Sequence, residues 1–162
     1  MNLSTEYAMF NQKNLTCYWG NRDELTDKQR KIIKELLSNL AKVPKCNAVL
    51  EADVSVLGAS LTDKKYDRPA NPALSLLGDA NTGTVIKFEM VGPEDDAIVM
   101  LAEILIGFIF RYGAPKEIRV SNVIVEAGLE QICNVCGIKL RRVKRLQGLD
   151  EFIQGMYHRY SL

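Results

Sequence analysis

Two carboxylates, Glu51 and Asp53, lie in the segment 48–57, where apolar and polar residues alternate. A period of two is typical of a strand, so both carboxylates belong to one face. Two-metal phosphodiester chemistry needs several carboxylates around Mg²⁺ or Mn²⁺, and Glu126 could complete such a set. The alternative is a structural ion pair between this face and Arg119 on a neighbouring strand. The sequence favours the structural interpretation.

Ser121 and Asn122 end a short predicted strand, EIRVS, and precede a predicted helix. Ligands in α/β domains usually gather at the carboxyl ends of strands, so Ser121 and Asn122 are candidates for a site shared with Asp53. Their neutral oxygens are weak metal ligands. Because Ser and Asn are favoured helix N-caps, the sequence indicates that the pair caps the helix that begins near Val123.

The strongest charge feature is KLRRVKR, residues 139–145. Its five cations are Lys139, Arg141, Arg142, Lys144 and Arg145. They could contact a nucleic-acid backbone, or they could protect an edge strand from aggregation. Lys and Arg number 21 against 20 Asp and Glu, which gives a formal net charge of +1 and no bulk attraction to nucleic acid or membrane. Binding to a polyanion would therefore depend on this local patch.

Cys133 and Cys136 have the spacing of a redox or zinc motif. Together with Leu129 and Ile132 they fall at i, i+3, i+4 and i+7, which is the apolar stripe of a helix, so we expect core packing. The amino-terminal residues lack a secretory pattern, and the expected compartment is the cytoplasm, where the four cysteines remain reduced. We find no glycine loop, dinucleotide motif or zinc-protease motif and expect no cofactor, except Mg²⁺ under the catalytic hypothesis.

The longest apolar run, residues 97–110, is shorter than the roughly 18 residues that suggest a membrane span, so it predicts a buried helix and no membrane partner. In full, the predicted elements are a helix at 27–43, strands at 48–57, 73–79 and 84–91, a helix at 94–112, a strand at 117–121, a helix at 123–136, a strand at 138–143 and a helix at 149–160. Asp79 is expected to bond its own backbone in the hairpin turn. Gly137 is expected to end the helix before it.

This order predicts an α/β fold, a five-stranded mixed sheet with helices on both faces, in a single compact domain. Residues 1–45 are expected to form an N-terminal segment and an amphipathic helix that packs on the core. Residues 46–162 are expected to form the α/β domain proper.

Three pieces, LEADVSVLG, ALSLLGDANTGTVIKFEMV and RYGAPKEIRVSNVIVEAGLEQICNVCGIKL, resemble the ribonuclease-H-like catalytic core of integrases and transposases across residues 46–145. The resemblance implies that Asp53 occupies the position of the first catalytic aspartate. Ser121 stands where the second metal-binding aspartate would be, and the last helix offers only Asp150 and Glu151 as a third carboxylate. The C-terminal half also resembles an uncharacterised bacterial domain of unknown function, which implies no activity.

The sequence therefore favours a non-catalytic binding or scaffold domain whose partner is an unknown protein or a nucleic acid. One alternative is a Mg²⁺- or Mn²⁺-dependent nuclease or phosphodiesterase that uses Asp53 with Glu51 and Glu126. The other is a non-catalytic nucleic-acid binder that uses the basic strand at 139–145. Because the helix at 94–112 is apolar on nearly all sides, a homodimer is a further hypothesis.

Overall fold

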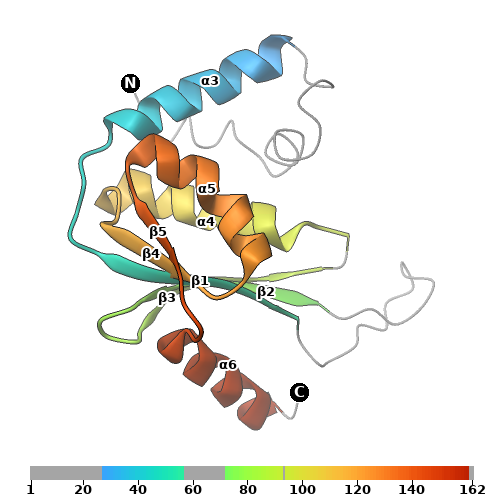
Figure 1. Ribbon diagram of the computed structural model, residues 1–162. Coiled ribbons are helices and arrows are strands. Elements are labelled where there is room, and N and C mark those ends of the chain that lie inside the picture. The colour runs from blue at the N-terminus through green and yellow to red at the C-terminus, as the bar shows by residue number, and fades with distance from the viewer. Residues whose placement is uncertain (1–26, 57–71, 93, 161–162) are drawn as a thin grey trace.

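The computed structural model describes residues 27–56, 72–92 and 94–160 (Figure 1). The elements are α3 (Asp27–Lys42), β1 (Val49–Val56), β2 (Ala73–Asp79), β3 (Val85–Val91), α4 (Ala97–Tyr112), β4 (Glu117–Val120), α5 (Val123–Cys136), β5 (Lys139–Arg142) and α6 (Gln147–Tyr160). The strands form one sheet in the order β3-β2-β1-β4-β5. The β1–β2 and β2–β3 pairs are antiparallel, whereas β1–β4 and β4–β5 are parallel. The predicted α/β fold with ribonuclease-H-like topology is confirmed.

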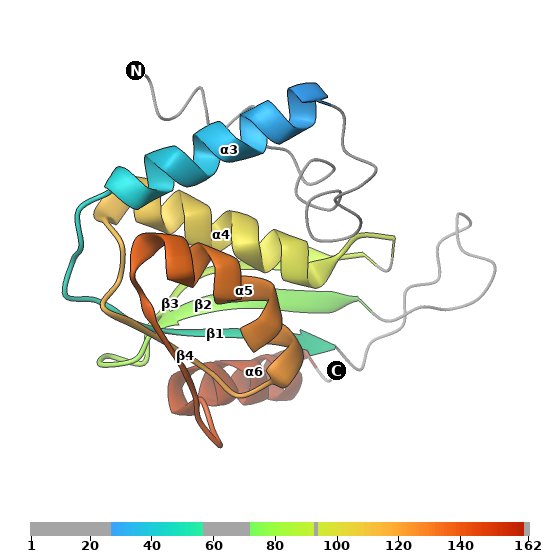
Figure 2. The ribbon, with the colours of Figure 1, turned by 45° about the horizontal axis from the view of Figure 1, so that its top comes forward.

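Helices α3, α4 and α5 lie on one face of the sheet, and α6 lies on the other (Figures 1 and 2). The larger core is between the sheet and the three helices, where Leu50 and Ala52 of β1 meet Leu105 and Ile109 of α4. Helix α3 contributes its apolar stripe to this core, through Ile33, Leu36 and Leu40. The N-terminal helix is therefore part of the hydrophobic core of the domain.

A smaller core lies beneath the sheet. It consists of Leu74 and Leu76 of β2 together with Leu146 and Leu149 at the start of α6. Helix α6 packs mainly against β1, β2 and β3. The β4–β5 half of the same face is therefore the less covered half.

Two helices start at residues other than those predicted. Helix α4 begins at Ala97 because Asp96 is its N-cap, and the Asp96 carboxylate accepts from the backbone N–H groups of Ile98 and Val99 at 2.9 and 3.3 Å. Helix α6 begins at Gln147, so Gly148 lies in its first turn although glycine is a poor helix former.

The reason for Gly148 is the close approach of another backbone. A Cβ atom at this position would lie 2.8 Å from the Cα of Gly83, in the β2–β3 turn, and 3.0 Å from Oε1 of Glu51. Only glycine lets the first turn of α6 lie so near both groups. No helix in the described ranges is long and apolar enough to cross a membrane.

Candidate functional site

Glu51 and Asp53 lie on the α6 face of β1, as the alternation predicted. Glu51 is 6% exposed, and its carboxylate accepts hydrogen bonds from the backbone N–H groups of Gly148 and Leu149. Burial raises the pKa of Glu51, while these hydrogen bonds and the charge of Arg119 oppose the rise. Glu51 therefore satisfies N–H groups of the first turn of α6, which have no partner within the helix.

Asp53 lies two residues further along β1 and is partly buried. Burial raises its pKa to about 6; the N–H of Val54 opposes this rise, and the negative charge of Asp150 adds to it. Asp150 acts in the same direction on the pKa of Glu51, and its carboxylate lies 3.7 Å from Nε of Arg145. The structure thus places three acidic side chains near one another on the α6 face.

The other candidates for a metal set do not lie together: Glu126 is apart from Asp53, whereas Ser121 is in line with it. Glu126 is in the first turn of α5, in the layer on the opposite face of the sheet (Figure 1). Because β1 and β4 are parallel neighbours with Glu51 opposite Arg119, continuing this register aligns Ser121 with Asp53. Within residues 27–56, 72–92 and 94–160, no three His, Cys, Asp or Glu side chains are arranged to hold a metal ion.

Asn122 is the N-cap of α5, as predicted, and its Oδ1 accepts from the N–H of Ile124 at 2.7 Å. Asp79 also has its predicted structural role, because its Oδ1 accepts from the N–H groups of Asn81 and Thr82 at 2.8 and 3.1 Å. Both side chains therefore stabilise local backbone geometry.

The two cysteines of α5 are core residues, as the helical stripe predicted. Burial raises the pKa of Cys133 to about 12 and that of Cys136 to about 11. Sγ of Cys136 lies 3.7 Å from the carbonyl oxygen of Leu40. Such thiols are protonated at neutral pH and are poor nucleophiles or metal ligands.

Arg119 forms its ion pair with Glu117 on its own strand, at 2.8 Å between Nε and Oε2. Glu117 also lies 3.7 Å from Nζ of Lys139 and is a buried carboxylate. The hydrogen bond from Arg119 lowers the pKa of Glu117, and the charges of Arg119, Lys139 and Arg141 lower it further. Sequence reasoning missed Glu117, although its position two residues before Arg119 places both side chains on one face.

A groove of about 290 Å³ opens on the β4–β5 half of the α6 face. We call it the cationic groove; its lining consists of Val49, Lys116, Glu117, Arg119, Lys139 and Arg141. Strands β4 and β5 pair with Glu117 opposite Lys139 and Arg119 opposite Arg141. Since opposed residues share a face of the sheet, the two strands present these side chains together.

The cations of the basic segment 139–145 do not lie on one face of the sheet. Lys139 and Arg141 face the cationic groove, whereas Arg142 has the opposite parity in β5. Lys144 and Arg145 follow the strand, and Arg145 pairs with Asp150. Strand β5 is also the predicted edge strand, because it is the last strand in the sheet order.

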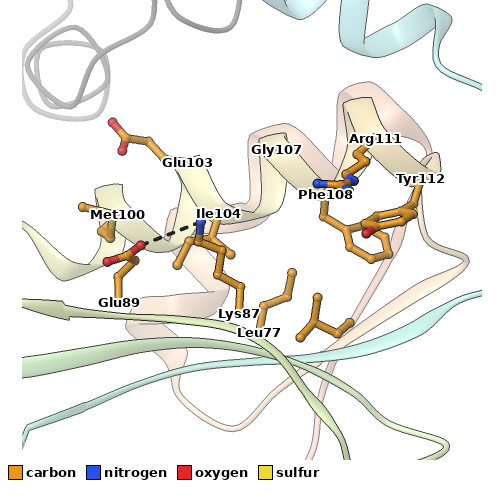
Figure 3. A pocket seen from close by; sticks show the side chains of 11 residues that line it. Leu77, Lys87, Glu89, Met100, Glu103, Ile104, Gly107, Phe108, Arg111 and Tyr112 are labelled. Atoms are coloured by element: carbon orange, nitrogen blue, oxygen red, sulfur yellow. Dashed lines mark ion pairs between the residues drawn. The ribbon is translucent and has the colours of Figure 1, made fainter. Parts of the chain in front are cut away.

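A second pocket, of about 390 Å³, lies between α4 and β3 and was not foreseen (Figure 3). Its walls include Leu77, Met100, Ile104, Phe108 and Tyr112, together with the charged residues Lys87, Glu89, Glu103 and Arg111. In Figure 3, Lys87 and Glu89 project side by side from β3, and their charged groups are 3.8 Å apart. The Phe108 and Tyr112 rings pack with centroids 5.0 Å apart on α4. The pocket thus has an apolar base and charged residues on both sides, Lys87 and Glu89 from β3 and Glu103 and Arg111 from α4.

Residues 36–157 match the model of a family described as a domain of unknown function (DUF6930). No curated protein matches the chain. Among solved structures, the chain is similar to part of the cryo-EM structure of a simian T-cell lymphotropic virus intasome in complex with PP2A regulatory subunit B56 gamma, with 14% identity and a TM-score of 0.40. This match covers 93% of the present chain but only 55% of the other chain.

Proposed function

The chain belongs to this family of domains of unknown function (DUF6930), and we propose that it is a non-catalytic binding domain whose cationic groove binds the phosphate backbone of nucleic acid. The observation that carries the proposal is the lining of the groove, in which Lys116, Arg119, Lys139 and Arg141 surround Glu117. Glu51 is outside the lining, but its charge interacts with that of Arg119. If Glu51 is counted as well, four cations stand against two carboxylates. A local excess of this kind attracts a polyanion although the net charge of the chain is only +1.

The strongest support comes from Arg119 and Arg141, which occupy directly opposed positions in β4 and β5. Like charges at opposed positions destabilise a sheet. Glu117 offsets part of this repulsion through Arg119, and a phosphate between the guanidinium groups would offset the rest. Arginine suits this role because its planar group binds phosphate oxygens with two parallel hydrogen bonds.

The non-catalytic part of the proposal rests on the carboxylates. Glu51 is engaged with the backbone of α6, and Glu126 lies in the opposite helical layer. A metal-dependent reaction that uses Asp53 with these two residues would require Glu51 to leave α6 and Glu126 to change layers.

Fluorescence anisotropy with labelled single-stranded and duplex oligonucleotides tests the proposal. Reversing two groove charges, Lys139→Glu with Arg141→Glu, should weaken binding at least about tenfold, because it removes contacts to phosphate and adds repulsion. The matched control, Lys31→Glu with Lys34→Glu, makes the same change in net charge on the exposed face of α3. Equal losses in both variants, or no binding by the wild-type chain, would contradict the proposal.

A further inference from the structure

Strand β3 is a long edge strand with exposed apolar side chains, and its only two charged residues, Lys87 and Glu89, are of opposite sign. It ends the order of the described strands and is seven residues long. Three of its apolar side chains are exposed to solvent: Ile86 by 39%, Phe88 by 47% and Met90 by 57%. The opposite edge, β5, has four residues and carries three cations. Edge strands are normally kept apart by short length or by like charges, so a long edge with exposed apolar side chains and no net charge marks a pairing surface.

We propose that β3 pairs antiparallel with β3 of a second copy of this chain, about a two-fold axis at Phe88, so that one sheet continues across a homodimer. The sequence of the strand carries this proposal, because Lys87 and Glu89 flank Phe88 symmetrically. A two-fold axis at Phe88 places Lys87 of each copy opposite Glu89 of the other. Each dimer therefore gains two cross-strand ion pairs.

Neighbouring registers are disfavoured by charge. Residues that face each other in an antiparallel pair share a face of the sheet, so the axis of a symmetric pairing passes through a residue, and the two positions next to Phe88 are Lys87 and Glu89. The first shift places two lysines in direct opposition, and the second places two glutamates there. Of these three registers, the one centred on Phe88 pairs opposite charges and avoids like charges.

The two faces of β3 fit this arrangement. Lys87 is opposite Leu77 in the β2–β3 ladder, and the side chains of Lys87 and Glu89 line the pocket beneath α4 (Figure 3). Phe88 is opposite Leu76 and points to the α6 face, where its ring lies 5.4 Å from that of Phe152. In the dimer the two Phe88 rings meet at the axis, with a Phe152 ring on either side.

The length of the regular pairing is limited by an irregularity. The β2–β3 register shifts between Leu77 and Gly78, which leaves Ile86 outside the regular ladder. Pairing between copies is therefore centred on Lys87, Phe88 and Glu89, with the exposed Met90 at its margin. Because so few residues pair between the copies, we expect weak association, so that the fraction of dimer depends on protein concentration.

Sedimentation equilibrium of the purified chain from about 5 to 500 µM tests this proposal. The wild-type chain should show a monomer–dimer equilibrium. Either Lys87→Glu or Glu89→Lys should lower the association constant at least about tenfold, because each variant converts both cross-strand pairs to like charges. The double variant with both changes should restore association to within about threefold, since it exchanges the charges and keeps every pair opposite.

Lys34→Glu, on the exposed face of α3, makes the same net charge change as Lys87→Glu and should leave association unchanged. Far-ultraviolet circular dichroism confirms that each variant remains folded. The β3 pairing would be overturned if the wild-type chain is monomeric at all concentrations. It would also be overturned if neither single charge reversal changes the association constant, or if the double variant does not restore it.

Discussion

Asp53 should destabilise the folded chain at neutral pH. Burial raises its pKa from 3.8 to about 6, so between these values the folded chain binds more protons than the unfolded chain. The free energy of unfolding therefore decreases as pH rises through this window. Replacing the carboxylate with a neutral amide, Asp53→Asn, removes this loss, and Oδ1 of Asn can still accept from the N–H of Val54.

The displacement of the Asp53 pKa corresponds to roughly 3 kcal/mol at about 1.4 kcal/mol for each pKa unit. Because the side chain keeps some contact with solvent, we expect Asp53→Asn to stabilise the fold by about 1–2 kcal/mol at pH 7.5. The gain should disappear near pH 4, where Asp53 is protonated in the folded chain. The pKa values of Glu51 and Glu103 are also raised by burial. The free energy of unfolding of the Asp53→Asn variant should therefore still decrease somewhat as pH rises.

Urea denaturation followed by circular dichroism at several values between pH 4 and 8 measures this difference. The matched control is Glu130→Gln, which makes the same chemical change at an exposed position of α5. A gain of equal size at pH 4 and pH 7.5, or a loss of stability at pH 7.5, would refute the argument from burial.

The remaining predictions concern α6 and the metal hypothesis. Gly148→Ala should destabilise the fold by about 1–3 kcal/mol, because the new Cβ meets Gly83 and Glu51 at 2.8 and 3.0 Å. Gly155→Ala, where a Cβ meets nothing within 4 Å, should instead stabilise the same helix by about 0.5–1 kcal/mol, and equal effects in thermal unfolding would contradict the close approach. Calorimetric titration with Mg²⁺ or Mn²⁺ should show no tight binding; tight binding that Asp53→Asn abolishes would instead support the catalytic hypothesis.

The fold was accessible from the sequence because its elements carry strong local signals. Strand β2 was predicted with the bounds that the structure gives, since ALSLLGD is a short, mostly apolar run that ends at a turn. The end of α5 at Gly137 was equally plain, because this residue adopts the left-handed conformation that glycine allows, with φ of 68°. Such signals depend on a few neighbouring residues.

The site was less accessible because it depends on contacts between distant elements. Nothing near Gly148 in the sequence indicates that Gly83 and Glu51 approach it, so the start of α6 was placed two residues late. The cationic groove needed the register of β4 and β5, which pairs Arg119 with Arg141 and divides the basic segment between two faces. The sequence supplied the residues, and the register determined which of them act together.

The central claim, that the cationic groove binds phosphates, is tested most directly by the salt dependence of nucleic-acid affinity. For duplex DNA the slope of log K against log salt concentration is about −0.9 for each phosphate contact. We predict that the Lys139→Glu, Arg141→Glu variant has a slope shallower than that of the wild-type chain by about 2, because two such contacts are lost. An unchanged slope would contradict the account, because it would show that these two side chains contact no phosphate.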